Sequence, residues 1–111
     1  MNKLVLASAL ALTIVPTAAN ANNTLPASDL LLACTTPDIE WVNFCNGFFQ
    51  AAHDAAANAG RVCVPSGVSR ADLATLYQIE ATKLIANDRS VGGISGVSLS
   101  AIIFEQNFPC G

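Results

Sequence analysis

The chain has 111 residues, of which 5 are Lys or Arg and 8 are Asp or Glu, and its formal net charge is −3 at neutral pH. This acidic balance argues against nucleic acid and anionic membranes as partners, because both are bound through basic patches, and it permits a basic protein partner. The length corresponds to one small domain, whose limited core favours covalent cross-links.

The first 21 residues have the pattern of a secretory signal peptide. Lys3 supplies a positive start, an apolar run covers residues 4–15, and residues 19–21 have the small-x-small form of a cleavage site. The apolar run is shorter than the about 20 residues that span a bilayer, so we expect a cleaved leader rather than a retained membrane anchor. Residues 22–111 are therefore expected to form a single exported domain in the periplasm.

The mature part is expected to open with two helices. Ser28 and Asp29 are suited to cap a short helix that ends near Cys34. Thr36 follows as the expected N-cap of a second helix over residues 37–59, which has proline at its first position and acidic residues in its first turn.

The second predicted helix has more apolar residues than one face requires. Its main apolar stripe, at helical spacing, is expected to face the core, while Val42 and Phe49 lie off that stripe. Apolar residues there indicate either a dimer interface or burial between two helices of one subunit, and the small size of the domain favours a homodimer. The expected core stripe consists of Trp41, Phe44, Cys45, Phe48 and Ala52.

Two further helices are predicted in the second half of the chain. Ser69 and Asp72 form a near capping box that begins a helix ending close to Asn87. Residues 88–96 contain three glycines, each of which disfavours helix by about 1 kcal/mol relative to alanine, so we expect the longest loop here. A last helix is predicted over residues 97–107. No alternating strand pattern is longer than four residues, so the fold class is all-α, a small bundle of about four helices.

The four cysteines all lie in the part expected to be exported, and an even count in an oxidising compartment indicates two disulfides. The helix between Cys45 and Cys63 would span roughly 27 Å, whereas bridged Cα atoms lie within about 7 Å. Cys34 is held near the start of the same helix and cannot reach Cys63 either. The remaining pairing is Cys34–Cys45 and Cys63–Cys110, and it gives Cys63 a structural role.

The sequence shows no recognisable constellation of catalytic or metal-binding residues. The cysteines lack the Cys-x-x-Cys spacing of redox and zinc sites, and the chain has a single histidine. His53 and Asp54 are neighbours, but adjacent helix positions do not face each other, so we expect a solvated position rather than a dyad. We therefore expect a protein that is not an enzyme and needs no cofactor or metal.

The segment after the third predicted helix is the best binding candidate. Its charged tip, Asp88-Arg89-Ser90, is followed by Gly92 and Gly93 and is suited to enter a cleft. Arg89 is able to form bidentate hydrogen bonds with a carboxylate. The alternative is an ordinary mobile connection, since glycine-rich loops are common.

Four motifs occur in order along almost the whole mature chain. They are Asp29-Leu30-Leu31 with Cys34, then Phe44-Cys45-Asn46-Gly47-Phe48, then Cys63-Val64-Pro65-Ser66-Gly67-Val68-Ser69, and finally Phe108-Pro109-Cys110. As an ordered set that includes all four cysteines, they resemble the Rap/Tai family of periplasmic immunity proteins of type VI secretion.

The resemblance implies a helical protein, often a homodimer, that binds a cognate secreted toxin and blocks it with a loop placed in the active-site cleft. Several toxins paired with this family are peptidoglycan amidases. The resemblance thus adds weight to residues 88–93 as the toxin-binding segment. Two other functions stay open. One is a small helical periplasmic chaperone of acid stress, which would expose apolar surface when carboxylates are protonated. The other is a small hydrolase or oxidoreductase, which the missing motifs disfavour.

Overall fold

The computed structural model describes residues 24–111, so the predicted signal peptide, residues 1–21, lies outside the described part. This part of the chain forms helices α3 (Ala27–Thr35), α4 (Ile39–Asn58), α5 (Arg70–Asn87), the 3-10 helix η1 (Arg89–Gly93) and α6 (Gly96–Asn107). Its only extended pairing is one isolated antiparallel bridge between Pro26 and Ser95. The predicted all-α class, with four α-helices and two disulfides, is confirmed.

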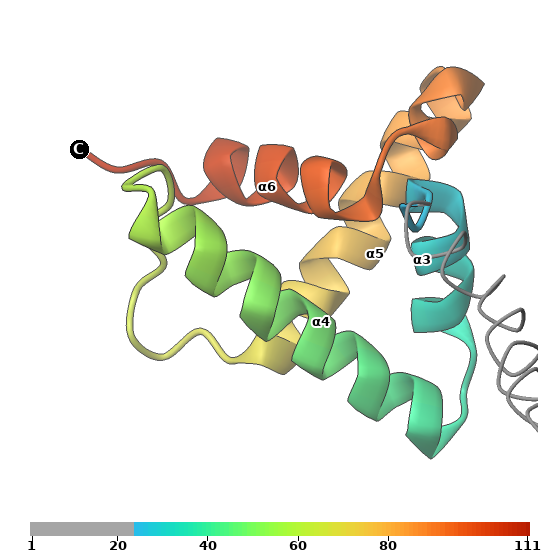
Figure 1. Ribbon diagram of the computed structural model, residues 1–111, viewed down its shortest axis with the longest axis horizontal. Coiled ribbons are helices and arrows are strands. Elements are labelled where there is room, and N and C mark those ends of the chain that lie inside the picture. Colours follow the sequence, from blue (N-terminus) through green and yellow to red (C-terminus); the bar gives the residue numbers. More distant parts are fainter. Residues whose placement is uncertain (1–23) are drawn as a thin grey trace, which may run out of the picture.

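The helices cross one another rather than running as a parallel bundle (Figure 1). Helix α4 packs against α5 and α6, which also contact each other, and α3 closes one end of the molecule beside α5 and η1. The connection over residues 59–69 carries the chain from the end of α4 back to the start of α5 (Figure 1). A single core therefore forms where α4, α5 and α6 meet.

An aromatic cluster occupies that meeting point. The ring centroid of Phe49 lies 4.9 Å from that of Tyr77 and 6.1 Å from that of Phe104, and all three side chains are fully buried. The Tyr77 hydroxyl donates a 2.8 Å hydrogen bond to the carbonyl oxygen of Ala27, which ties α5 to the first turn of α3. Burial raises the pKa of Tyr77 well above its usual value, so the phenol keeps the proton that this hydrogen bond needs.

The first helix boundary differs from its prediction. Helix α3 begins at Ala27, directly after Pro26, and no side chain caps it, so the predicted capping by Ser28 and Asp29 is wrong. Proline needs no hydrogen-bond partner for its own nitrogen and has a restricted backbone, so it suits a helix start. The chain therefore enters the helix two residues earlier than the polar residues suggest.

The start of α4 also differs from its prediction. Asp38, rather than Thr36, is the N-cap, and its carboxylate accepts a 2.9 Å hydrogen bond from the backbone N–H of Glu40. The Thr36 hydroxyl instead donates to the carbonyl oxygen of Leu32 in α3. Thr36 thus ends one helix rather than beginning the next.

The capping box at the start of α5 is confirmed. The Ser69 hydroxyl accepts a 3.1 Å hydrogen bond from the backbone N–H of Asp72, and the Asp72 carboxylate accepts a 2.9 Å bond from the backbone N–H of Ser69. Asp replaces the more usual Glu without loss of either bond.

Both predicted disulfides are present. Cys34–Cys45 joins the last turn of α3 to α4, with Cα atoms 5.6 Å apart, and Cys63–Cys110 joins the connection after α4 to the C-terminal tail, with Cα atoms 5.0 Å apart. The backbone N–H of Cys63 also donates a 2.9 Å hydrogen bond to the carbonyl oxygen of Phe108. The tail is therefore held by a covalent bond and a hydrogen bond at the same place.

Candidate functional site

The segment predicted to bind a partner, residues 88–93, forms an ordered corner between α5 and α6. The Asp88 carboxylate accepts hydrogen bonds from both the backbone N–H of Ser90, at 3.0 Å, and its hydroxyl, at 2.7 Å. The backbone N–H of Val91 then donates to the carbonyl oxygen of Asp88, so the chain continues as the 3-10 helix η1. The prediction of a glycine-rich loop without helix is therefore wrong.

Close packing explains why glycines occur in and after this corner. A Cβ placed on Gly92 would lie 3.1 Å from the Cβ of Ser28, and one on Gly96 would lie 2.8 Å from Cδ2 of Leu30. Gly92 and Gly96 thus let η1 and the start of α6 approach α3. The role of these two glycines is therefore to permit close packing on α3, whereas the sequence suggests that they make the segment flexible.

The corner presents charged and polar groups to solvent. Asp88, Arg89, Ser90 and Gly93 are exposed, whereas Gly92 is buried against α3 and cannot touch a partner. Hydrogen bonds from Ser90 lower the pKa of Asp88, which keeps its carboxylate charged and the corner capped in mild acid. Arg89 forms no ion pair with any other residue between 24 and 111, so its guanidinium is available to an external carboxylate.

The neighbours His53 and Asp54 do interact, contrary to the prediction. Nδ1 of His53 lies 3.0 Å from the Asp54 carboxylate, which also accepts a 3.0 Å hydrogen bond from the Gln50 side-chain amide one turn earlier. The hydrogen bonds from His53 and then Gln50 lower the pKa of Asp54. The cluster lies on the solvent-facing side of α4, where Asp54 is exposed and His53 is partly exposed.

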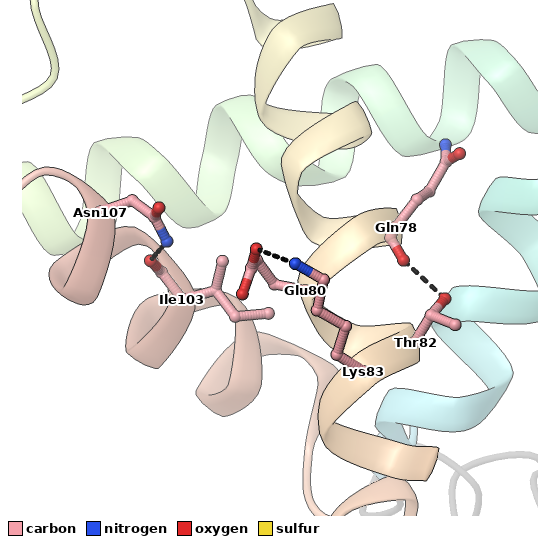
Figure 2. A network of polar contacts seen from close by, with 6 residues as sticks. All are labelled: Gln78, Glu80, Thr82, Lys83, Ile103 and Asn107. Carbon is pink, nitrogen blue, oxygen red and sulfur yellow. Dashed lines mark hydrogen bonds and ion pairs between the residues drawn. The ribbon is translucent and has the colours of Figure 1, made fainter. Parts of the chain in front are cut away.

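Glu80, Thr82 and Asn107 form contacts within their own helices. Figure 2 shows Glu80 paired with Lys83 at 3.5 Å on the surface of α5. In the same view, the Thr82 hydroxyl donates to the carbonyl oxygen of Gln78, and the Asn107 amide donates to that of Ile103 in α6 (Figure 2). These contacts join residues three or four positions apart, so they stabilise individual helices by small amounts.

The two candidate surface residues of α4 have different environments. Phe49 is fully buried at the centre of the core, so it packs inside the subunit and is not exposed to a second copy. Val42 is 42% exposed near the start of the helix. The predicted core stripe is also only partly right, because its aromatic members Trp41 and Phe44 are 45% and 41% exposed.

Helix α4 in fact carries two apolar strips side by side. The inner strip, which faces α5 and α6, consists of Cys45, Phe49, Ala52 and Ala56. The outer strip consists of Trp41, Phe44, Phe48, Ala51 and Ala55, of which Phe48 is partly buried and the others are exposed.

Both strips have the alternating three- and four-residue spacing of a helix seam. On the outer strip, neighbouring rings are in contact: the centroids of Trp41 and Phe44 are 5.7 Å apart, and those of Phe44 and Phe48 are 5.9 Å apart. The sequence contained this spacing as a signal, but the single-stripe interpretation merged the two strips into one.

Among residues 24–111, no helix is long and apolar enough to cross a membrane, and no group of three or more His, Cys, Asp or Glu is placed to hold a metal ion. In comparisons with known proteins, no protein-family model, no curated protein and no solved structure matches the chain. Its own residues and their geometry are therefore the basis for a functional assignment.

Proposed function

We propose that the protein is a periplasmic immunity protein that binds one secreted toxin of type VI secretion and inhibits it. The observation that carries this proposal is the corner Asp88–Gly93, a hydrogen-bonded turn whose exposed Arg89 forms no ion pair with any residue of the described part, 24–111. The two disulfides support export to an oxidising compartment. The ordered motifs that resemble the Rap/Tai family supply the class of partner, and peptidoglycan amidases are the toxins that the resemblance favours.

The corner has the physical properties of an inhibitory projection. Its backbone is already fixed by the hydrogen bonds of Asp88 and by the packing of Gly92 on α3, so little conformational entropy remains to be lost on binding. Arg89 at its tip would then meet a carboxylate at the mouth of the toxin's cleft. A bidentate arginine–carboxylate pair that is shielded from water stabilises a complex more than an exposed pair does.

The test is a charge reversal at the corner. We expect Arg89→Glu to weaken binding of the toxin encoded beside this gene by at least about 30-fold, because it replaces an attraction with a like-charge contact. Arg70→Glu is the matched control, since Arg70 is an exposed residue at the first position of α5 and the change in net charge is identical. The control should change affinity by less than about threefold.

Titration calorimetry on the oxidised, exported protein measures the affinity, and thermal unfolding checks that both variants remain folded. Equal affinities for Arg89→Glu and the parent, with an intact fold, would reject the corner as the contact site. Absence of binding to the neighbouring gene's product would count against the immunity function itself.

An acid-stress chaperone is the second candidate, and the exposed aromatic rings of the outer strip favour it, since a chaperone needs an apolar surface. Its expected trigger is protonation of carboxylates. The hydrogen bonds that lower the pKa values of Asp54 and Asp88 stabilise the folded state, and that stability is lost as the pH falls through these lowered pKa values. Suppression of client aggregation in acid, combined with no toxin binding, would establish the chaperone instead.

A further inference from the structure

We infer that Cys63–Cys110 is a thiol–disulfide exchange site, which an external dithiol opens while Cys34–Cys45 stays closed in the folded protein. The inference begins from the different exposure of the two bonds. Cys34 and Cys45 are 9% and 2% exposed, whereas Cys63 is exposed and Cys110 is only partly buried. Exposed disulfides are the more readily reduced ones, because exchange requires a thiolate to reach a sulfur atom.

The backbone on both sides of the exposed bond is free of regular secondary structure. Residues 61–65 lie in the connection after α4, and residues 109–111 end the chain beside it (Figure 1). Within residues 24–111, no backbone hydrogen bond is made by residues 109–111. No helix therefore has to open before a thiolate reaches this bond.

The other disulfide lies inside the fold. Cys34 belongs to the last turn of α3, and Cys45 lies on the inner strip of α4. The carbonyl oxygen of Cys34 also accepts a 2.9 Å hydrogen bond from the side-chain amide of Gln78 in α5. Attack on this bond requires α3 and α4 to separate, so its opening depends on unfolding of that region.

The exchange begins at Cys63, the more exposed of the two partners. A thiolate of the dithiol attacks Sγ of Cys63 and forms a mixed disulfide, and the bond to Cys110 breaks with its electron pair on Sγ of Cys110, which then takes up a proton. The second thiolate of the dithiol displaces Sγ of Cys63, which is protonated in turn. The dithiol leaves oxidised as a disulfide, and the protein retains two thiols. A single glutathione carries out only the first of these steps.

Three other contacts keep the tail near Cys63 after the bond opens. The backbone N–H of Cys63 donates to the carbonyl oxygen of Phe108, the Phe108 side chain packs partly buried against the core, and Arg61 pairs with Glu105 at 3.3 Å. Cys110 is only two positions beyond Phe108, so its thiolate stays at a high effective concentration. The bond therefore closes again when the dithiol is removed, and the exchange is reversible without unfolding.

Alkylation after timed exposure to dithiothreitol tests the inference on the oxidised, exported protein. Peptide mass mapping measures the opening rate of each bond, and circular dichroism follows the helices. We expect Cys63–Cys110 to open at least about 30-fold faster than Cys34–Cys45, with the helical signal retained. The matched control is the same reaction in denaturing guanidinium chloride, where both bonds are exposed and the two rates should agree within about threefold.

Reaction with glutathione, stopped by a maleimide, tests the point of attack. We expect glutathione on Cys63 and the maleimide on Cys110, because Cys63 is the exposed partner and Cys110 is the leaving group. The opposite distribution would overturn Cys63 as the point of attack.

Removal of the Phe108 side chain tests the return step. Phe108→Ala should shift the equilibrium with glutathione toward the open form about fivefold or more, because a looser tail lowers the effective concentration of Cys110. Ile102→Ala is the matched control, since Ile102 is 41% exposed on α6. The control should stay within about twofold of the parent. Circular dichroism confirms that both variants are folded.

Equal opening rates of the two bonds in the folded protein would overturn the inference. So would opening of Cys63–Cys110 that coincides with loss of the helical signal, and a rate difference that persists in guanidinium chloride would overturn exposure as its cause. An equilibrium that Phe108→Ala leaves unchanged would overturn the return step. None of these measurements uses the toxin, so each outcome is separate from the test of the proposed function.

Discussion

The two strips of α4 have the same spacing and similar composition, yet they have different neighbours. Phe49 on the inner strip is fully buried between Tyr77 and Phe104, whereas Phe44 on the outer strip, little more than one helical turn away, is 41% exposed. Burial of a whole aromatic side chain stabilises the fold by about 1.5–3 kcal/mol relative to its exposure. The inner strip therefore contributes to folding, and the outer strip retains apolar surface that folding of one chain does not cover.

The largest expected effect on stability distinguishes the two strips, and it is measured by replacing one phenylalanine of each strip with alanine. Phe49→Ala should cost about 3–5 kcal/mol, because it removes the ring at the centre of the aromatic cluster and leaves a cavity. A small domain has about 5–15 kcal/mol of total stability, so this variant should be close to unfolding at 37 °C. Phe44→Ala should lower Tm by only a few degrees. Thermal unfolding followed by circular dichroism measures both.

A loss of stability of equal size in the two variants would remove the distinction between the strips. Measurement at low protein concentration, where any dimer has dissociated, keeps the comparison within one subunit. If Phe44→Ala became costly only at high concentration, the difference would report covering of the outer strip by a second copy.

The contrast also shows which features were predictable from the sequence. The all-α class follows from helical periodicity, and the disulfide pairing follows from the length of the helix between Cys45 and Cys63. Periodicity alone does not say which of two adjacent strips faces inward. That choice depends on where Tyr77 and Phe104 lie in space, and they are 28 and 55 positions from Phe49 along the sequence.

The glycines in and after the corner are a second feature that the sequence alone does not explain. Glycine has two uses, as a flexible residue and as a residue that permits close approach, and the sequence does not distinguish them. Only the position of α3 shows that Gly92 and Gly96 serve close approach. The exposure of Arg89 was predictable from its charge. The capping of η1 by Asp88 joins residues only two positions apart, so its signal was also present in the local sequence.

The disulfides at the two ends of α4 give the next effect in size. Chain-entropy estimates give about 4 kcal/mol for closing the long loop between Cys63 and Cys110 and about 3 kcal/mol for the shorter loop between Cys34 and Cys45, often less in practice. We therefore expect Cys63→Ser to lower Tm under oxidising conditions. The comparison with the reduced parent isolates the bond, since the reduced parent and the reduced variant should unfold at nearly the same temperature.

An oxidised Cys63→Ser variant that melts with the oxidised parent would contradict the structural role of this bond. Because Cys45 belongs to the inner strip, loss of its bridge should also loosen the start of α4, where the exposed rings of the outer strip lie. Faster amide hydrogen exchange in the first turns of α4 in a Cys34→Ser variant, compared with Cys63→Ser, would identify that local effect.

The smallest expected effect on stability comes from replacing either of two glycines, Gly96 and Gly47, with alanine, because the two have different surroundings. In Gly96→Ala the new Cβ would lie 2.8 Å from Cδ2 of the fully buried Leu30 and 3.3 Å from the carbonyl oxygen of Leu25, so the packing of α3 must shift. Overpacking of this kind costs about 1–3 kcal/mol. In Gly47→Ala the new Cβ meets nothing within 4 Å, and the residue lies inside α4 on its solvent side. Replacement by alanine should therefore stabilise the protein by about 0.5–1 kcal/mol through helix propensity.

Urea unfolding of both variants, at a concentration where the protein is monomeric, measures these opposite signs. If Gly96→Ala were neutral, α6 would have room to move away from α3, and the close approach would not explain the glycine. If Gly47→Ala stabilised the monomer and at the same time weakened association, its added methyl group would lie against a second copy. The outer side of α4 would then be defined by two independent substitutions, one at an aromatic ring and one at a glycine beside it.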